Sequence, residues 1–127
     1  MQRDIVLRWI EDMAALVARL LRGNRAVDLE LARRHVEEAM EQLLGPLHAL
    51  TARLEPASVA VLLHDPERLF AYARLLALAA AIDQADGLPG AEAARRRAIE
   101  LARAALERTP EPPPEWVAWV EAGAREA

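Results

Sequence analysis

Three consecutive arginines, Arg95, Arg96 and Arg97, are the residues of this sequence whose type and spacing point most directly to chemistry. A guanidinium group presents a planar fork of N–H donors that fits phosphate or carboxylate oxygens. Their alanine-rich surroundings predict a helix over residues 91–108. Successive helical residues are about 100° apart, so three in a row cannot all face one ligand. We interpret these arginines as a solvated helix face.

The overall charge does not favour a general polyanion binder. The net charge is −4, whereas nucleic-acid-binding domains usually carry a basic excess. No aromatic residue lies among the three arginines to stack on a base. We expect no nucleic-acid partner, and an anion- or nucleic-acid-binding helical module through Arg95–Arg97 is the alternative function.

Residues suited to catalysis are scarce. The chain has no cysteine, one serine (Ser58) and two threonines (Thr51 and Thr109), so a hydroxyl or thiol nucleophile has few candidates. The three histidines lack the paired spacing of a zinc site. We expect no enzymatic activity, no catalytic residue, no metal site and no cofactor.

Two tryptophans near the end of the sequence indicate a docking surface. Trp116, Trp119 and Val120 share one face of a short predicted helix that follows a proline-rich spacer over residues 110–114. So short a helix is not stable alone in water, so it must be docked. Docking in cis would use the groove between helices 3–21 and 91–108, and docking in trans would use a partner or a second copy. Together with Arg95 and Arg96, these three residues are the candidate partner-binding residues.

The elements that position these residues are predicted to be helices. Hydrophobic residues make up 54% of the chain but aromatic residues only 4%, with alanine and leucine dominant, which favours helices over strands. Helices are expected over residues 3–21, 28–44 and 91–108, with short helical turns between 46 and 64 and a further long helix that begins at Pro66 and is apolar over residues 69–82. The first is apolar around most of its circumference and is expected to be covered on two sides.

A strong helix start precedes the third long helix. Asp65 is a capping carboxylate, Pro66 suits the first helical position, and Glu67 favours the positive end of the helix dipole. The helix that follows is apolar nearly all round, so we expect it to be the buried central helix. Asp83 and Asp86 lie at its end, where Arg95 and Arg96 are expected to reach back and form ion pairs.

Small residues recur at the spacing of the second helix of a tetratricopeptide repeat. The matching positions are Ala98, Ala102, Ala105 and Pro110, and the first three recur in helix 28–44 as Ala32, Val36 and Ala39. The chain also resembles a family of short, uncharacterised bacterial helical proteins that are grouped as a domain of unknown function. That resemblance rests on "DIVLRWIEDMAALVARLL", "EEAMEQLLG", "PASVAVLLHDPERL" and the turn at Gly87. It implies a fold and brings no catalytic residue.

The expected protein is all-α: a tetratricopeptide-like pair of antiparallel helical hairpins with a short-helix connecting segment and a C-terminal helix. Residues 1–109 are expected to form the helical domain, and residues 110–127 the proline-rich spacer and the tryptophan-bearing helix. No apolar run is long enough to span a bilayer, so we expect a cytoplasmic protein without a membrane partner. The expected function is a non-catalytic protein–protein interaction or scaffold module that binds a protein or peptide, with a homodimer as a further possibility.

Overall fold

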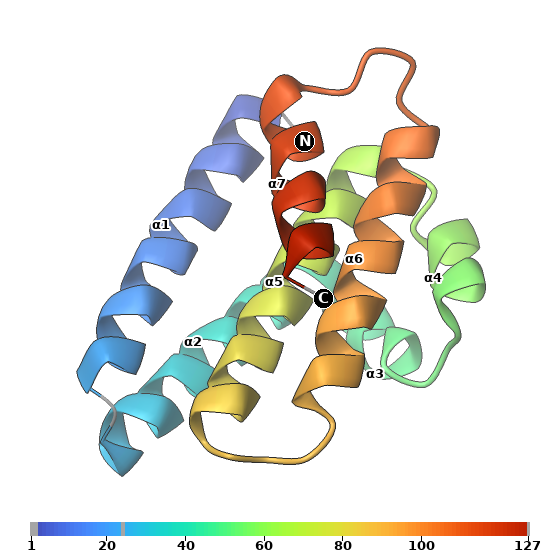
Figure 1. The fold of residues 1–127 in the computed structure, drawn as a ribbon. Helices are drawn as coiled ribbons and strands as arrows, with labels where there is room; N and C mark the ends of the chain where they lie inside the picture. The colour runs from blue at the N-terminus through green and yellow to red at the C-terminus, as the bar shows by residue number, and fades with distance from the viewer. Residues whose placement is uncertain (1–2, 24, 127) are drawn as a thin grey trace.

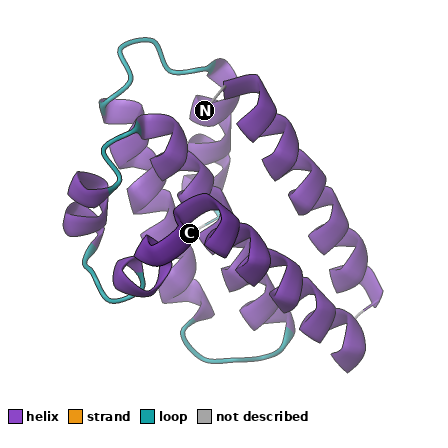
Figure 2. Ribbon diagram, turned by 180° about the vertical axis from the view of Figure 1, so that it is seen from behind, coloured by secondary structure: helices purple, strands orange, loops and turns teal. Residues whose placement is uncertain are grey.

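The computed structural model describes residues 3–23 and 25–126 of the 127-residue chain. Helices and the turns between them make up this part, which confirms the all-α prediction for it (Figures 1 and 2). The elements are α1 (Arg3–Gly23), α2 (Ala26–Leu44), the 3-10 helix η1 (Gly45–Leu47), α3 (His48–Thr51), α4 (Pro56–Leu62), α5 (Pro66–Ala85), α6 (Ala91–Glu107) and α7 (Pro114–Arg125).

Helix α5 is the centre of the molecule. It begins as expected, with the Asp65 carboxylate accepting a hydrogen bond from the backbone N–H of Glu67 at 3.1 Å. Helices α1, α2 and α6 all pack against it. Its buried residues confirm the prediction of a central helix: Leu69, Phe70, Ala71, Tyr72, Ala73, Leu75, Ala80 and Ile82.

Helix α6 runs back along α5 in the most extensive helix–helix contact of the described chain (Figure 1). The turn between them contains Gly87 and Gly90, both with positive φ, a conformation that suits glycine. Ala98, Ala102 and Ala105 are completely buried, and their small side chains let the two helices approach closely. The alanines singled out in the sequence are therefore packing residues.

Helices α1 and α2 form the other side of the molecule. Helix α1 contacts α2 and α5, so it is covered on two sides as expected. The cover is incomplete, because only Val6, Ile10 and Val17 among its described side chains are fully buried. Ile5 stays 64% exposed and Trp9 is half-buried. Helix α1 is therefore an edge helix, and part of its apolar surface is exposed.

None of the described helices combines the length and the hydropathy that a membrane crossing requires.

Candidate interaction surfaces

Stacked aromatic rings hold α7 against its own chain. Trp116 lies nearly parallel to Phe70 of α5, with 4.3 Å between ring centroids and 7° between ring planes. Trp119 meets the same Phe70 ring edge-on, at 5.7 Å. Trp116 is 2% exposed and Val120 is 5% exposed, so both belong to the main hydrophobic core. In this structure α7 docks in cis.

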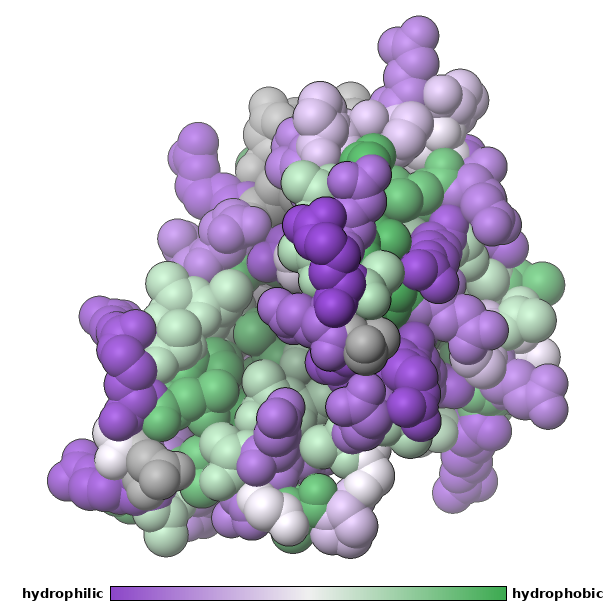
Figure 3. Space-filling view, viewed as in Figure 1, coloured by the Kyte–Doolittle hydropathy of each residue, from purple (hydrophilic) through white to green (hydrophobic). Residues whose placement is uncertain are grey.

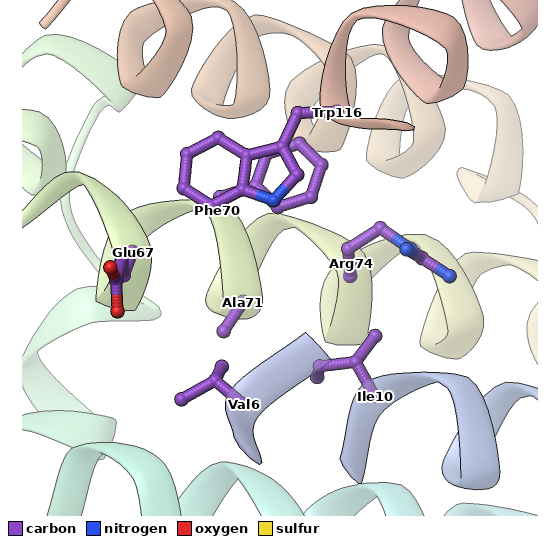
Figure 4. Close-up of a pocket in the computed structure, with 7 residues that line it drawn as sticks. All are labelled: Val6, Ile10, Glu67, Phe70, Ala71, Arg74 and Trp116. Carbon is purple, nitrogen blue, oxygen red and sulfur yellow. The ribbon is translucent and has the colours of Figure 1, made fainter. Parts of the chain in front are cut away.

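Helix α7 lies where the sequence predicted, over the groove between α1 and α6 (Figure 1). Its main aromatic contact, however, is with the central helix α5, which lies beneath that groove. Val6 and Ile10 of α1 approach Trp116 from one side (Figure 4). The prediction missed Phe70, because nothing in a uniformly apolar helix marks the residue that will face a distant segment.

A small cavity lies beneath Trp116 (Figure 4). Its volume of about 10 Å³ fits one water molecule and is far below the roughly 300 Å³ of a typical ligand pocket. Within the described chain, Trp116 Nε1 and Glu67 Oε2 are buried without a hydrogen-bond partner. Arg74 borders the cavity, lies 5.2 Å from the Trp119 ring centroid and pairs with Glu11 at 3.2 Å. A cavity of this size is too small for a small-molecule ligand.

The other end of α7 is fixed to α6. The Arg95 guanidinium donates a 2.8 Å hydrogen bond to the Gly123 carbonyl oxygen. A Cβ atom at Gly123 would collide with the Ile99 side chain, so α6 and α7 are in close contact at this glycine. Arg95 and Gly123 together set how α7 lies across α6.

The three adjacent arginines serve three different places. Arg95 holds α7, and Arg97 donates to the Thr51 carbonyl oxygen at the end of α3, at 3.1 Å. Arg96 is exposed, and its one ion pair in the described chain is with Glu92 at 3.7 Å. They do not converge on one point, as expected for three successive helical residues. The prediction of a solvated face is correct for Arg96 but wrong for Arg95 and Arg97, which are partly buried against α7 and α3.

Arginines also satisfy the carboxyl ends of two more helices, whose last carbonyl groups lack partners within the helix. Arg68 of α5 donates to the carbonyl oxygens of Leu43 and Leu44 at the end of α2. Arg108 donates to the carbonyl oxygens of Ala60 and Leu63 at the end of α4. Arg68 thus ties the end of α2 to α5, and Arg108 ties the end of α4 to the end of α6.

The acidic end of α5 has a different partner from the predicted one. Arg33 of α2 pairs with Asp83 at 2.5 Å and with Asp86 at 3.0 Å, whereas Arg95 and Arg96 do not reach these acids. The hydrogen bond to Asp83 is the main cause that raises the pKa of Arg33 above its ordinary value. The prediction of ion pairs at this turn was correct, but the arginines assigned to them were wrong, because α2 packs against α5 and brings Arg33 to these acids, whereas Arg95 bonds to Gly123.

An apolar groove opens between α1 and α2. It has a volume of about 390 Å³ and is lined by Ile5, Val6, Trp9, Gln42 and Leu43. Trp9 is half-buried in it, and Ile5 projects at its rim. Its lining is more apolar than those of the hollows between α4 and α6, between α2 and α5, and between α6 and α7.

Most of the predicted partner-binding residues are used inside the fold. Trp116 and Val120 are core residues, Trp119 is half-buried against Phe70, and Arg95 is bonded to Gly123. A partner could reach Trp116 only if α7 left its place. Their assignment to partner binding stays a prediction.

Sequence reasoning passed over Ile5 and Trp9. Both belong to the apolar arc of the first helix, and the width of that arc was the available signal. What it could not show is which part of the arc α2 and α5 leave open.

Comparisons of this chain with protein-family models, with curated proteins and with solved structures gave no match.

Proposed function

We propose that this chain is a non-catalytic protein–protein interaction module that binds a helical segment of another protein in the groove between α1 and α2. The observation that carries this proposal is the incompletely covered apolar surface of α1. Ile5 and Trp9 border a groove with an apolar lining, at the edge of an otherwise well-packed protein. Tryptophan is enriched among the residues that dominate binding energy at protein interfaces.

The shape of the surface selects the kind of partner. One mode of peptide recognition adds a strand to a sheet edge, and the described part of the chain has no strand. A groove between two helices instead accepts a helix, which satisfies its own backbone hydrogen bonds. The partner segment is therefore an amphipathic helix whose apolar side chains cover Trp9 and Ile5.

The tetratricopeptide-like arrangement is part of the same proposal. Ala32, Val36 and Ala39 in α2 are buried, as are Ala98, Ala102 and Ala105 in α6. Both sets thus occupy packing positions, which supports the repeat-like spacing seen in the sequence. Paired helices of this kind commonly present grooves to helices or peptides of other proteins.

The alternative function, anion or nucleic-acid binding through Arg95–Arg97, has less support. Arg95 and Arg97 already donate to carbonyl oxygens of their own chain. Phosphate contacts would also make binding fall steeply as the salt concentration rises, whereas an apolar groove would be far less sensitive. A salt titration of any binding partner separates the two functions.

The test compares two matched substitutions at exposed apolar residues. Ile5→Glu places a charge at the rim of the groove, and Val61→Glu places one on α4, away from the groove, at a residue that is 73% exposed. Proteins captured from the source organism by the wild type should also be captured by Val61→Glu but not by Ile5→Glu. A captured protein, once purified, should protect the amides of α1 and α2 from hydrogen exchange.

Equal capture by both variants contradicts this placement of the binding site. So would protection confined to elements other than α1 and α2. Because Ile5 and Val61 are both largely exposed, neither substitution should unfold the protein, and thermal melting checks this.

A further inference from the structure

The outer face of α6 carries an alternating row of charges. Arg96, Glu100, Arg103 and Glu107 are all exposed and follow one another at spacings of four, three and four residues. That spacing places them on one stripe along the helix. Hydrophilic side chains are prominent on this side of the molecule (Figure 3).

Two hollows flank the stripe, one on each side of α6. The hollow between α4 and α6 has a volume of about 440 Å³, and that between α6 and α7 about 290 Å³. Glu100 and Arg103 line both of them. Another helix can therefore approach α6 along the length of the stripe.

These charges are largely unused within the described chain. Glu100, Arg103 and Glu107 form no ion pair there, although their spacing would allow pairs along the helix. Arg96 has only the 3.7 Å ion pair with Glu92. The neighbouring Arg95, Arg97 and Arg108 all have carbonyl partners, so the stripe is the part of this arginine-rich helix left without an internal role.

When two copies of this helix are placed antiparallel, each charge of the stripe faces a charge of opposite sign. The stripe reads positive, negative, positive, negative, with its midpoint between residues 101 and 102. A second copy turned about a two-fold axis at that midpoint would place Glu107 opposite Arg96, and Arg103 opposite Glu100. Each pair then occurs twice, giving four ion pairs. A parallel copy in register would place like charges together.

We propose that α6 is a self-association surface through which two copies of this chain pair antiparallel. We infer that a second copy binds this face because the charges of the stripe are complementary to those of another α6 in the antiparallel orientation. Exposed ion pairs are individually weak, so the dimer is weak, sensitive to salt and fixed in register by its charges. It uses α6 and leaves the α1–α2 groove free.

The test is a charge-reversal series followed by sedimentation velocity. Arg103→Glu turns two of the four pairs into Glu–Glu contacts and should weaken dimerisation at least about tenfold, as should Glu100→Arg. The double variant Glu100→Arg/Arg103→Glu restores opposite charges and should dimerise like the wild type. When the two single variants are mixed, they should form a heterodimer, although each alone should form only a weakened homodimer.

The control is Arg34→Glu, an exposed charge reversal on α2, which should leave the dimer unchanged. Salt at about 1 M, where the screening length falls to about 3 Å, should dissociate the wild-type dimer. A monomeric wild type at every concentration reached overturns the proposal. So does a dimer that survives Arg103→Glu, or one that the double variant fails to restore.

Discussion

Helices α1 and α7 both rest on α5, yet they use it differently. Helix α7 has only 12 residues and buries Trp116 against Phe70. Helix α1 has 21 residues, and its Trp9 is only half-buried while Ile5 is 64% exposed. A short helix has little stability of its own and is ordered only when its apolar face is covered, whereas a long edge helix can leave part of that face open. Tryptophan content alone therefore does not identify an interface.

Removing α7 should cause the largest change, because its apolar face covers part of the core. A chain that ends at Thr109 exposes the ring of Phe70 and should lose several kcal/mol of unfolding free energy. Its melting temperature should fall at every protein concentration. If α7 docked on a second copy, truncation would instead abolish a concentration-dependent dimer and leave the stability of the dilute protein nearly unchanged.

The two tryptophans give the most direct test of the contrast. Trp116→Ala should cost about 3–5 kcal/mol of unfolding free energy, because it removes a fully buried ring. Trp9→Ala should cost about 1–2 kcal/mol, since less buried area is lost. Urea denaturation measures both. Equal losses would mean that α1 is as firmly buried as α7.

The close approach of α7 to α6 can be tested at Gly123. Gly123→Leu should cost about 1–3 kcal/mol, because the new side chain occupies the space of the Ile99 side chain. Ala122→Leu adds the same side chain at an exposed neighbour and should be nearly neutral. Thermal unfolding measures both variants. Equal melting temperatures of Gly123→Leu and Ala122→Leu would contradict the close contact at Gly123.

The ion pairs between α2 and α5 should contribute less. Arg33→Gln removes the contacts with Asp83 and Asp86, but its side chain is 38% exposed, so the loss should stay below about 1 kcal/mol. High salt should reduce the difference from the wild type. A double-mutant cycle with Asp83→Asn measures the pairwise part, and a coupling of several kcal/mol would show that the pair is effectively buried.

The smallest effect is expected at the turn between α1 and α2. Arg25 hydrogen-bonds Asp28 at 2.8 Å, and this holds the pKa of Asp28 below its ordinary value of 3.8. A lowered pKa stabilises the fold above pH 3.8, and the contribution is lost as the pH falls further. The stability difference between wild type and Asp28→Asn should therefore shrink in that acid range. A difference that stays constant with pH would contradict it.

The sequence was sufficient where the deciding interactions are local. The cap at Asp65 and the glycine turn before α6 depend on neighbours within a few residues, and the structure shows both as predicted. The need to dock α7 also followed from its length alone.

Interactions between distant segments could not be predicted in the same way. Arg33 and Asp83 are 50 residues apart, and Arg97 and Thr51 are 46 apart. Arginine side chains are long enough to reach any of several acids or carbonyl groups, so only the packing of the helices selects the partner. The same is true of the candidate site, because the open part of α1 depends on where α2 and α5 lie.

The use of arginine at helix ends also limits how the protein can be modified after synthesis. The chain has no lysine, and arginine side chains hold the ends of α2, α3 and α4. Lysine acetylation, which acts by removing charge, has no side chain to act on here. Arginine methylation keeps the charge but blocks the second hydrogen bond of the fork. Arg68 uses that fork to hold two carbonyl groups, so a methyl group there would loosen the end of α2 without changing the net charge.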